Sequence, residues 1–297
     1  MSPPSPPDQL VRAVSSRGGI AVRAMVGSAL AEEAAQRHRT SPTASAALGR
    51  ALMGAVLLAA GGKQGATVQL QFRGDGPLGT LVAIADDEGR TRGYATHPEA
   101  HPAPRDGELD VAAAVGRGVL TVVRQRGGGG APYSGIVPIH SGTIAQDLAH
   151  YLADSEQTRC AVALGVFLER SGEIEAAAGF SVHVLPGAEE DEIEQVEANI
   201  RGFPGPGELV RGGCDANDLA DRLLDGLGSR QRLCTVPIFH CSCNGERVLR
   251  AVSLLSREEL REAAQEPDPL EVRCHFCAER FQIGPEQIAT LLAADRA

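Results

Sequence analysis

Apolar and polar side chains alternate through the middle of the chain in the pattern of half-buried β-strands. Val68, Leu70 and Phe72 alternate with glutamines, and this period of two indicates a strand with one buried face. Turns containing glycine and aspartate then lead into two further candidate strands. We therefore predict an antiparallel meander followed by more strands, at 68–72, 81–84, 91–96, 118–124, 134–138, 173–178 and 180–185.

Two segments show the helical period instead. Residues 43–60 carry leucine, valine and alanine at helical spacing, and residues 143–152 place Leu148 and Tyr151 on one face. Ser141 and Thr143 are the expected N-caps of the second helix. Because strands come in runs with the helices set apart from them, we predict an α+β fold rather than a parallel βαβ sheet.

The pattern weakens after Pro186 and Gly187. An acidic helix is expected over 189–200, glycines and prolines interrupt it at 202–207, and a short helix follows at 217–227. Because this stretch has many charges and few large apolar residues, we interpret 188–232 as a linker of marginal helices, with an ordinary helical connection as the alternative. The predicted domains are an N-terminal mixed sheet-and-helix core at 1–187, the linker at 188–232 and a small C-terminal unit at 233–297.

The C-terminal unit has its own local signals. A short helical face runs over 248–255, and Ser256 with Glu259 fits a capping box that starts another helix. Strands are expected at 270–273 and 281–283, and Pro285 suits the first position of a final helix.

Composition narrows the class of protein. The 297 residues carry a formal net charge of −10 and are 43% hydrophobic, which favours a globular protein and disfavours one that coats nucleic acid. The start is rich in proline, without the apolar core of a signal peptide. The longest apolar run, 51–60, is shorter than the ~20 residues that span a bilayer. We expect a cytoplasmic protein with no membrane partner.

The cysteines carry the candidate chemistry. Four of them form two close pairs separated by 30 residues, Cys241 with Cys243 and Cys274 with Cys277. In a reducing compartment such pairs indicate metal ligands or redox thiols, and four thiolates suit a closed tetrahedral Zn²⁺ site. Buried thiols and another metal are the alternatives, and the adjacent His240 and His275 are possible rival ligands. We expect the remaining cysteines to be small buried apolar residues: Cys160, Cys214 and Cys234.

Spacing alone leaves several functions open. Most four-cysteine zinc sites are structural, so the spacing favours a static zinc ribbon over a redox switch. A nucleic-acid-binding ribbon is disfavoured because residues 233–297 hold seven Arg against ten Asp and Glu, a net of −3. A thiol–disulfide oxidoreductase that uses Cys274 and Cys277 would need a thioredoxin-like context, which the pattern does not show.

A resemblance to a known family favours the redox switch over the static zinc ribbon. The segments 240–248 and 274–277 resemble the redox-switch domain of the 33-kDa heat-shock protein family, which consists of redox-regulated holdase chaperones. The likeness extends along the chain through 71–78, 92–94, 133–138, 155–157, 185–188, His38, Pro42, Leu48 and Gly49. The chain departs from the family pattern at Arg159–Cys160 and at Ala178–Gly179, away from the four cysteines.

The resemblance implies an ATP-independent chaperone that is not an enzyme. The reduced form would hold one Zn²⁺ per chain on Cys241, Cys243, Cys274 and Cys277 and stay inactive. Oxidation would join Cys241 to Cys243 and Cys274 to Cys277, zinc would leave, and the C-terminal unit and the linker would unfold. The implied partners are unfolding client proteins and, in the active form, a second copy of the chain, with no nucleic acid.

Overall fold

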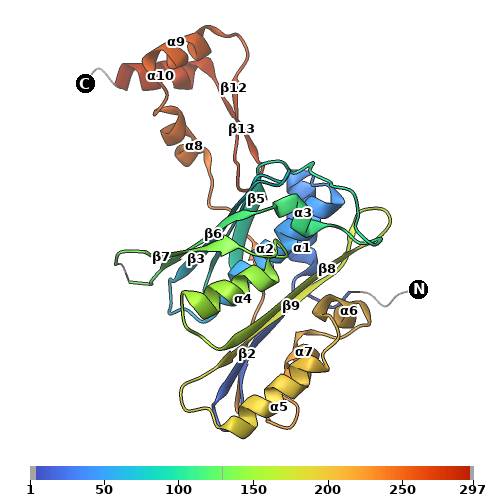
Figure 1. Cartoon of the computed structure of the whole chain (residues 1–297). Helices are drawn as coiled ribbons and strands as arrows, with labels where there is room; N and C mark the ends of the chain where they lie inside the picture. The colour runs from blue at the N-terminus through green and yellow to red at the C-terminus, as the bar shows by residue number, and fades with distance from the viewer. Residues whose placement is uncertain (1–4, 129, 295–297) are drawn as a thin grey trace. The chain divides into compact units, whose positions relative to one another are not determined.

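A computed structural model describes residues 5–128 and 130–294, so residues 1–4 of the proline-rich start lie outside the described residues. The chain forms two compact units, one ending at His240 and the other beginning at Cys241 (Figure 1). The structure is mixed α+β, as predicted. Each unit has its own core and is described separately.

A five-stranded antiparallel sheet forms one layer of the first unit, in the order β10-β1-β2-β9-β8. Its strands are β1 (Gln9–Val14), β2 (Ile20–Val26), β8 (Cys160–Leu168), β9 (Ile174–Val184) and β10 (Gln231–Thr235). We call it the five-stranded sheet. Its two central neighbours, β2 and β9, are buried along most of their length.

A six-stranded sheet forms a second layer, in the order β11-β5-β4-β3-β6-β7. Its strands are β3 (Thr67–Gly74), β4 (Thr80–Asp86), β5 (Arg90–Ala95), β6 (Gly118–Gln125), β7 (Tyr133–Ile139) and the short β11 (Ile238–Phe239). The meander predicted from alternating residues is confirmed, because β3, β4 and β5 pair antiparallel in sequence order. β11 adds a parallel edge strand beside β5.

The helix α2 (Pro42–Ala59) packs against both sheets. The Ser41 side chain accepts a hydrogen bond from the Ala44 N–H at the start of this helix, and proline occupies its first turn. By length and composition α2 could cross a membrane, yet 89% of that stretch is buried inside the fold. It is the core helix of the first unit. The shorter helices of this part are α1 (Ser28–His38), α3 (Val111–Val115) and α4 (Ala145–Asp154).

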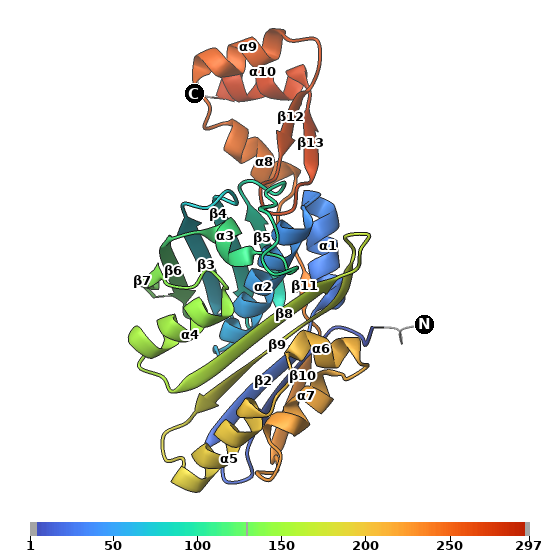
Figure 2. The same ribbon diagram turned by 45° about the vertical axis from the view of Figure 1, so that its right-hand side comes forward.

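The predicted linker region forms three helices, α5 (Glu190–Arg201), α6 (Pro206–Arg211) and α7 (Ala216–Leu223). They lie along the five-stranded sheet (Figure 2). They share one apolar cluster with that sheet: Val11, Ala13, Val22, Ala24, Phe180, Val182, Val196, Val210, Leu219 and Leu223 are all buried in it. The compact first unit also includes β10 and β11. Residues 233–240 therefore belong to the first unit, whereas the sequence predicted that they begin the C-terminal unit.

The second unit contains α8 (Gly245–Val252), α9 (Arg257–Gln265), the hairpin of β12 (Leu270–Arg273) and β13 (Arg280–Ile283), and α10 (Pro285–Ala294). The Ser256–Glu259 capping box and the start of the final helix at Pro285 are confirmed. The buried core is small, with Val248, Val252, Leu260, Ile283 and Ile288 at its centre.

Several local predictions were wrong. Strands β1, β2 and β8 were missed, because helices cover both faces of the five-stranded sheet and its strands lack a clean alternation. The strands expected at 173–178 and 180–185 are one strand, β9, which passes straight through Gly179. Ser141 and Thr143 do not cap α4, which has Ile144 at the N-cap without a side-chain hydrogen bond.

Three arginines gather where α2 ends. Each donates from Nη1 to one of the last carbonyls of the helix: Arg12 to Ala60 at 3.0 Å, Arg23 to Leu57 at 2.9 Å and Arg124 to Leu58 at 3.3 Å. Cations at a helix C-terminus satisfy carbonyls that have no partner within the helix and oppose its dipole.

His183 lies beside this group of arginines. Arg23 Nη1 is 3.3 Å from His183 Nε2, and because arginine only donates, that nitrogen must accept. Burial, followed by the charges of Arg23 and Arg124, lowers the pKa of His183 to about 4.

The low pKa of His183 predicts a loss of stability in mild acid. Its folded pKa of about 4 lies below the ordinary 6.5, so the unfolded chain takes up the proton first. The contribution is complete above the unfolded pKa and is lost as pH falls toward the folded one. Urea titrations should show this as about 2 kcal/mol of unfolding free energy between about pH 7 and about pH 5.

The variant His183→Gln should lose about 2 kcal/mol less over the same interval, because glutamine keeps an acceptor but does not titrate. His97→Gln is the matched control, since His97 is largely exposed beside Glu99, and it should follow the wild type. Equal losses in wild type and His183→Gln would contradict the assignment.

Candidate metal centre

The four cysteines singled out from the sequence come together in the second unit. Their sulfurs all lie within 4.8 Å of one another. Cys241 Sγ is 3.8 Å from Cys274 Sγ, and Cys243 Sγ is 3.3 Å from Cys277 Sγ. These separations are far longer than a covalent S–S bond of ~2.05 Å, and all four cysteines are free thiols.

The two cysteine pairs lie in two short local structures. Cys241 and Cys243 lie in the extended stretch just before α8, which begins after Asn244 because the Asn244 side chain accepts from the Arg247 N–H. Cys274 and Cys277 lie in the turn of the β12–β13 hairpin, which is the position expected for a zinc knuckle. The fold places the hairpin, and with it the second cysteine pair, next to the first pair. No local sequence rule specifies this contact between the two pairs.

Backbone hydrogen bonds close the hairpin turn around the second pair. The Ala278 N–H donates to the Cys274 carbonyl and the Cys274 N–H donates to the Glu279 carbonyl, both at 2.8 Å. Ala278 adopts φ of +59°, a left-handed conformation that costs a non-glycine residue energy. These hydrogen bonds close the turn that carries both sulfurs, which lie within 4.8 Å of each other.

The surroundings of the thiols set their ionisation. Burial raises the pKa of Cys277 to about 11, and burial together with contacts to the other cysteine sulfurs raises the pKa of Cys243. At Cys274 burial acts in the same direction, but the N–H groups of Cys277 and Phe276 outweigh it and lower the pKa. Four thiols packed this closely cannot all ionise without a compensating cation.

The sulfur positions fit a divalent metal ion. A tetrahedron with ~2.3 Å metal–sulfur bonds has sulfur–sulfur edges of ~3.8 Å, and the two cross-pair separations are 3.8 and 3.3 Å. The group of four consists of cysteines alone, so neither His240 nor His275 joins it. The four cysteines can therefore hold a metal ion. Within the described residues they form the one group of three or more potential ligands.

The three remaining cysteines lie elsewhere, in the first unit. Cys214 is half-buried against the cluster between the helices and the five-stranded sheet. Cys160 is half-buried on β8, where burial and then the charge of Glu156 raise its pKa to about 11. Cys234 is exposed on β10, so the expectation that it is a buried apolar residue was wrong. That expectation rested on residue type, which does not identify an edge strand.

Comparisons with known proteins agree along almost the whole chain. A model of the family described as Hsp33 protein matches residues 8–284. A 33 kDa chaperonin of Nostoc punctiforme is 40% identical over 295 residues, which cover 96% of each chain. A 33 kDa chaperonin of Listeria monocytogenes is 36% identical over 288 residues, covering 96% of this chain and 98% of the relative.

A solved structure gives the same result for the fold. The crystal structure of a 33 kDa chaperonin from Thermotoga maritima superimposes with a TM-score of 0.90 at 30% identity, covering 97% of this chain and 99% of that one. The sequence resemblance, the four-cysteine site and the fold therefore agree, and the chain belongs to the Hsp33 protein family.

Proposed function

We propose that this protein is a redox-regulated, ATP-independent holdase chaperone of the cytoplasm. The relatives named 33 kDa chaperonin support a chaperone function. The observation that carries the regulation is the group of four reduced sulfurs within 4.8 Å, in a unit whose core has only a few buried residues. Cys241, Cys243, Cys274 and Cys277 hold one Zn²⁺ per chain in the reduced protein.

A bound zinc ion supplies the second unit with the stability that its small core lacks. In small zinc-binding peptides the apparent binding free energy is on the order of 10–16 kcal/mol. Five buried apolar residues at the centre of the unit contribute about 1.5–3 kcal/mol for each large side chain, and the entropy cost of ordering the chain offsets much of that gain. The second unit therefore depends on its thiolates.

Oxidation acts on the same sulfurs. Each disulfide forms as two thiols lose two electrons and two protons, and one peroxide molecule accepts them to give two waters. Cys241 joins Cys243, and Cys274 joins Cys277. Because a disulfide sulfur is a poor metal ligand, the oxidised cysteines no longer hold zinc and the second unit unfolds.

The linker segment, residues 188–232, provides the surface that activation uncovers. Its helices cover a face of the five-stranded sheet that includes Val11, Val22, Phe180 and Val182. Exposed apolar area of this kind binds the apolar segments of unfolding proteins. The cover is incomplete, since a cavity of about 960 Å³ lies along α5, between Ile193, Val196 and Ile200 and the strands β8 and β9. We infer that the active form is a homodimer and has no nucleic-acid or membrane partner.

Removing one metal ligand should unfold the second unit alone. Cys277→Ser should reduce the zinc content from one ion per chain to near zero, and amide exchange over 245–294 should approach that of an unfolded chain. Cys234→Ser is the matched control, because Cys234 is an exposed thiol outside the group. Full zinc occupancy in Cys277→Ser would contradict the four-thiolate site.

The central test measures zinc release and client protection together. Zinc-loaded, reduced protein is treated with peroxide at elevated temperature, and light scattering follows a thermally unfolding client enzyme. We expect zinc release to accompany suppression of aggregation. A variant with serine at Cys160, Cys214 and Cys234 should behave like the wild type.

Zinc that stays bound, or that leaves without any gain in client protection, would rule out the switch. Salt-sensitive RNA binding would instead favour a nucleic-acid-binding ribbon, and catalytic turnover in disulfide reduction would favour an oxidoreductase.

A further inference from the structure

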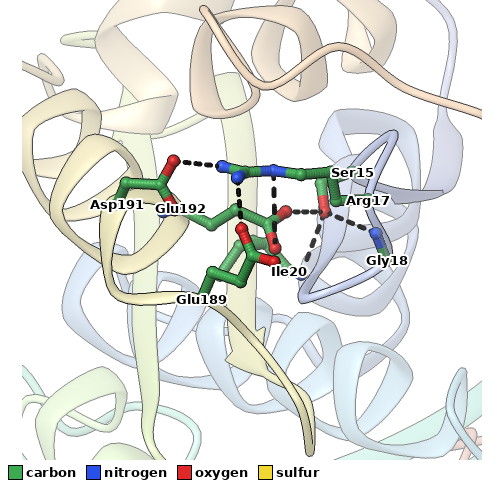
Figure 3. Close-up of polar contacts among 7 residues, drawn as sticks. All are labelled: Ser15, Arg17, Gly18, Ile20, Glu189, Asp191 and Glu192. Carbon is green, nitrogen blue, oxygen red and sulfur yellow. Dashed lines mark hydrogen bonds and ion pairs between the residues drawn. The ribbon is translucent and has the colours of Figure 1, made fainter.

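The turn between β1 and β2 holds itself in shape through one side chain. Ser15 is fully buried, and its Oγ accepts from the N–H groups of Gly18 and Ile20 at 3.2 and 3.1 Å. Gly18 adopts φ of +92°, which a residue with a side chain rarely takes. We call this turn, Ser15–Gly19, the clasp (Figure 3).

The clasp contacts a buried carboxylate at the start of the linker segment. Glu192 in the first turn of α5 is 1% exposed, and its Oε1 accepts from the Ser15 hydroxyl at 2.7 Å. A buried carboxylate is tolerated only where hydrogen bonds or charges replace its water. Ser15 therefore supports both the turn and the helix start.

Arg17 adds a bridge to the same helix start. Its Nη1 lies 2.6 Å from Glu189 Oε2, its Nη2 lies 2.7 Å from Asp191 Oδ2, and its Nε lies 4.0 Å from Glu192 Oε2. Figure 3 shows the guanidinium spanning the three carboxylates. The hydrogen bond from Arg17 lowers the pKa of Asp191. One exposed arginine thus bridges three of the four acidic side chains at this end of α5, with Glu190 outside the set.

The fit between the clasp and α5 requires a glycine. A Cβ on Gly19 would lie 2.4 Å from Glu192 Oε2 and 2.8 Å from the backbone Cα of Ala188. The second contact is with backbone, which cannot move aside without displacing the start of the linker segment. The turn and the segment therefore meet so closely that no side chain fits at residue 19.

The same turn also lies beside the far end of the linker segment. Backbone hydrogen bonds flank both ends: Leu185 N to Gly19 O at 2.8 Å, Ser16 N to Leu227 O at 3.2 Å, and Arg230 N to Val14 O at 3.2 Å. The two ends of the linker segment are thus both hydrogen-bonded at the turn between β1 and β2. Between these ends α5 buries only Glu192, Ile193 and Val196 beside the open cavity.

We propose that the clasp sets how readily the linker segment leaves the five-stranded sheet, so that Ser15 and Arg17 are positioning residues that tune activation. The regulatory part of this inference rests on the proposed holdase function. The fastening itself does not, because it is a property of the reduced, zinc-bound chain. None of the polar contacts of the clasp involves a cysteine. They can therefore break without any change at the cysteines, which gives the linker segment a second point at which its release is controlled.

The test compares amide exchange in α5 of the reduced, zinc-loaded full chain. Arg17→Gln should exchange roughly twofold to fivefold faster than wild type, since the exposed ion pairs are individually weak. Ser15→Ala should exchange faster on the order of tenfold, because it leaves the Glu192 carboxylate buried without its donor. Arg17→Lys should recover part of the protection, since lysine keeps the charge but lacks the planar fork.

Arg90→Gln is the matched control. The Arg90 side chain is 46% exposed against 45% for Arg17, and it contacts two carboxylates, at 2.7 and 2.9 Å, in the six-stranded sheet. Its exchange in α5 should match that of the wild type. If Arg17→Gln and Ser15→Ala also match the wild type, the clasp does not fasten the segment and the inference is overturned.

Peroxide activation separates this inference from the proposed function. Variants with faster α5 exchange should protect a client after shorter oxidation than wild type and Arg90→Gln do, with unchanged zinc content beforehand. Faster exchange with an unchanged activation time would overturn the regulatory role of the clasp. A wild type that never gains protection would overturn the proposed function instead, while the exchange rates would still decide whether the clasp fastens the segment.

Discussion

The five-stranded sheet has two apolar faces, and the first unit requires a cover for each of them. The core helix α2 packs on one face and is itself enclosed by the second sheet. The other face is covered by α5–α7, and within the described part of the first unit no further layer lies outside them. The sheet thus has one cover that is deeply buried and one that meets solvent on its outer side, and the second is the one that the proposed activation releases.

Polar contacts hold one end of each cover in place. Arg12, Arg23 and Arg124 satisfy the last carbonyls of α2, a set of contacts enclosed within the unit. The cover on the opposite face depends on a buried carboxylate at Glu192 and the exposed Arg17. Exposed ion pairs gain little energy in water and are weakened by salt, so the two covers differ in how easily they are released.

The second unit follows the same physical logic with a different chemistry. Its few buried apolar residues surround no large core, and the four clustered thiols favour a cation because their negative forms repel one another. A unit whose order depends on thiolates is sensitive to any oxidant that consumes them. In the proposed function, stability and chemical sensitivity therefore reside in the same sulfur atoms.

The sequence pattern predicted secondary structure correctly where residues that are close in sequence are also in contact in the fold. The β3–β5 meander, the Ser256 capping box and the β12–β13 hairpin were predicted because each depends on short-range turn and cap chemistry. Prediction was wrong where distant packing overrode local preference. Ser141 and Thr143 look like caps, but the buried Asp147 accepts from the backbone N–H groups of His140 and Ser141 instead.

The sequence by itself identified the four cysteines that can hold a metal ion, because two tight cysteine pairs bring their sulfurs together through local geometry and leave only their meeting to the fold. It also determined the family, through motifs spread along the chain. Only the tertiary structure decided that β10 and β11 belong to the first unit, that Cys234 is exposed and that Ser15 meets Glu192. Each of these is a contact or an exposure set by residues far apart in the chain, for which no spacing rule exists.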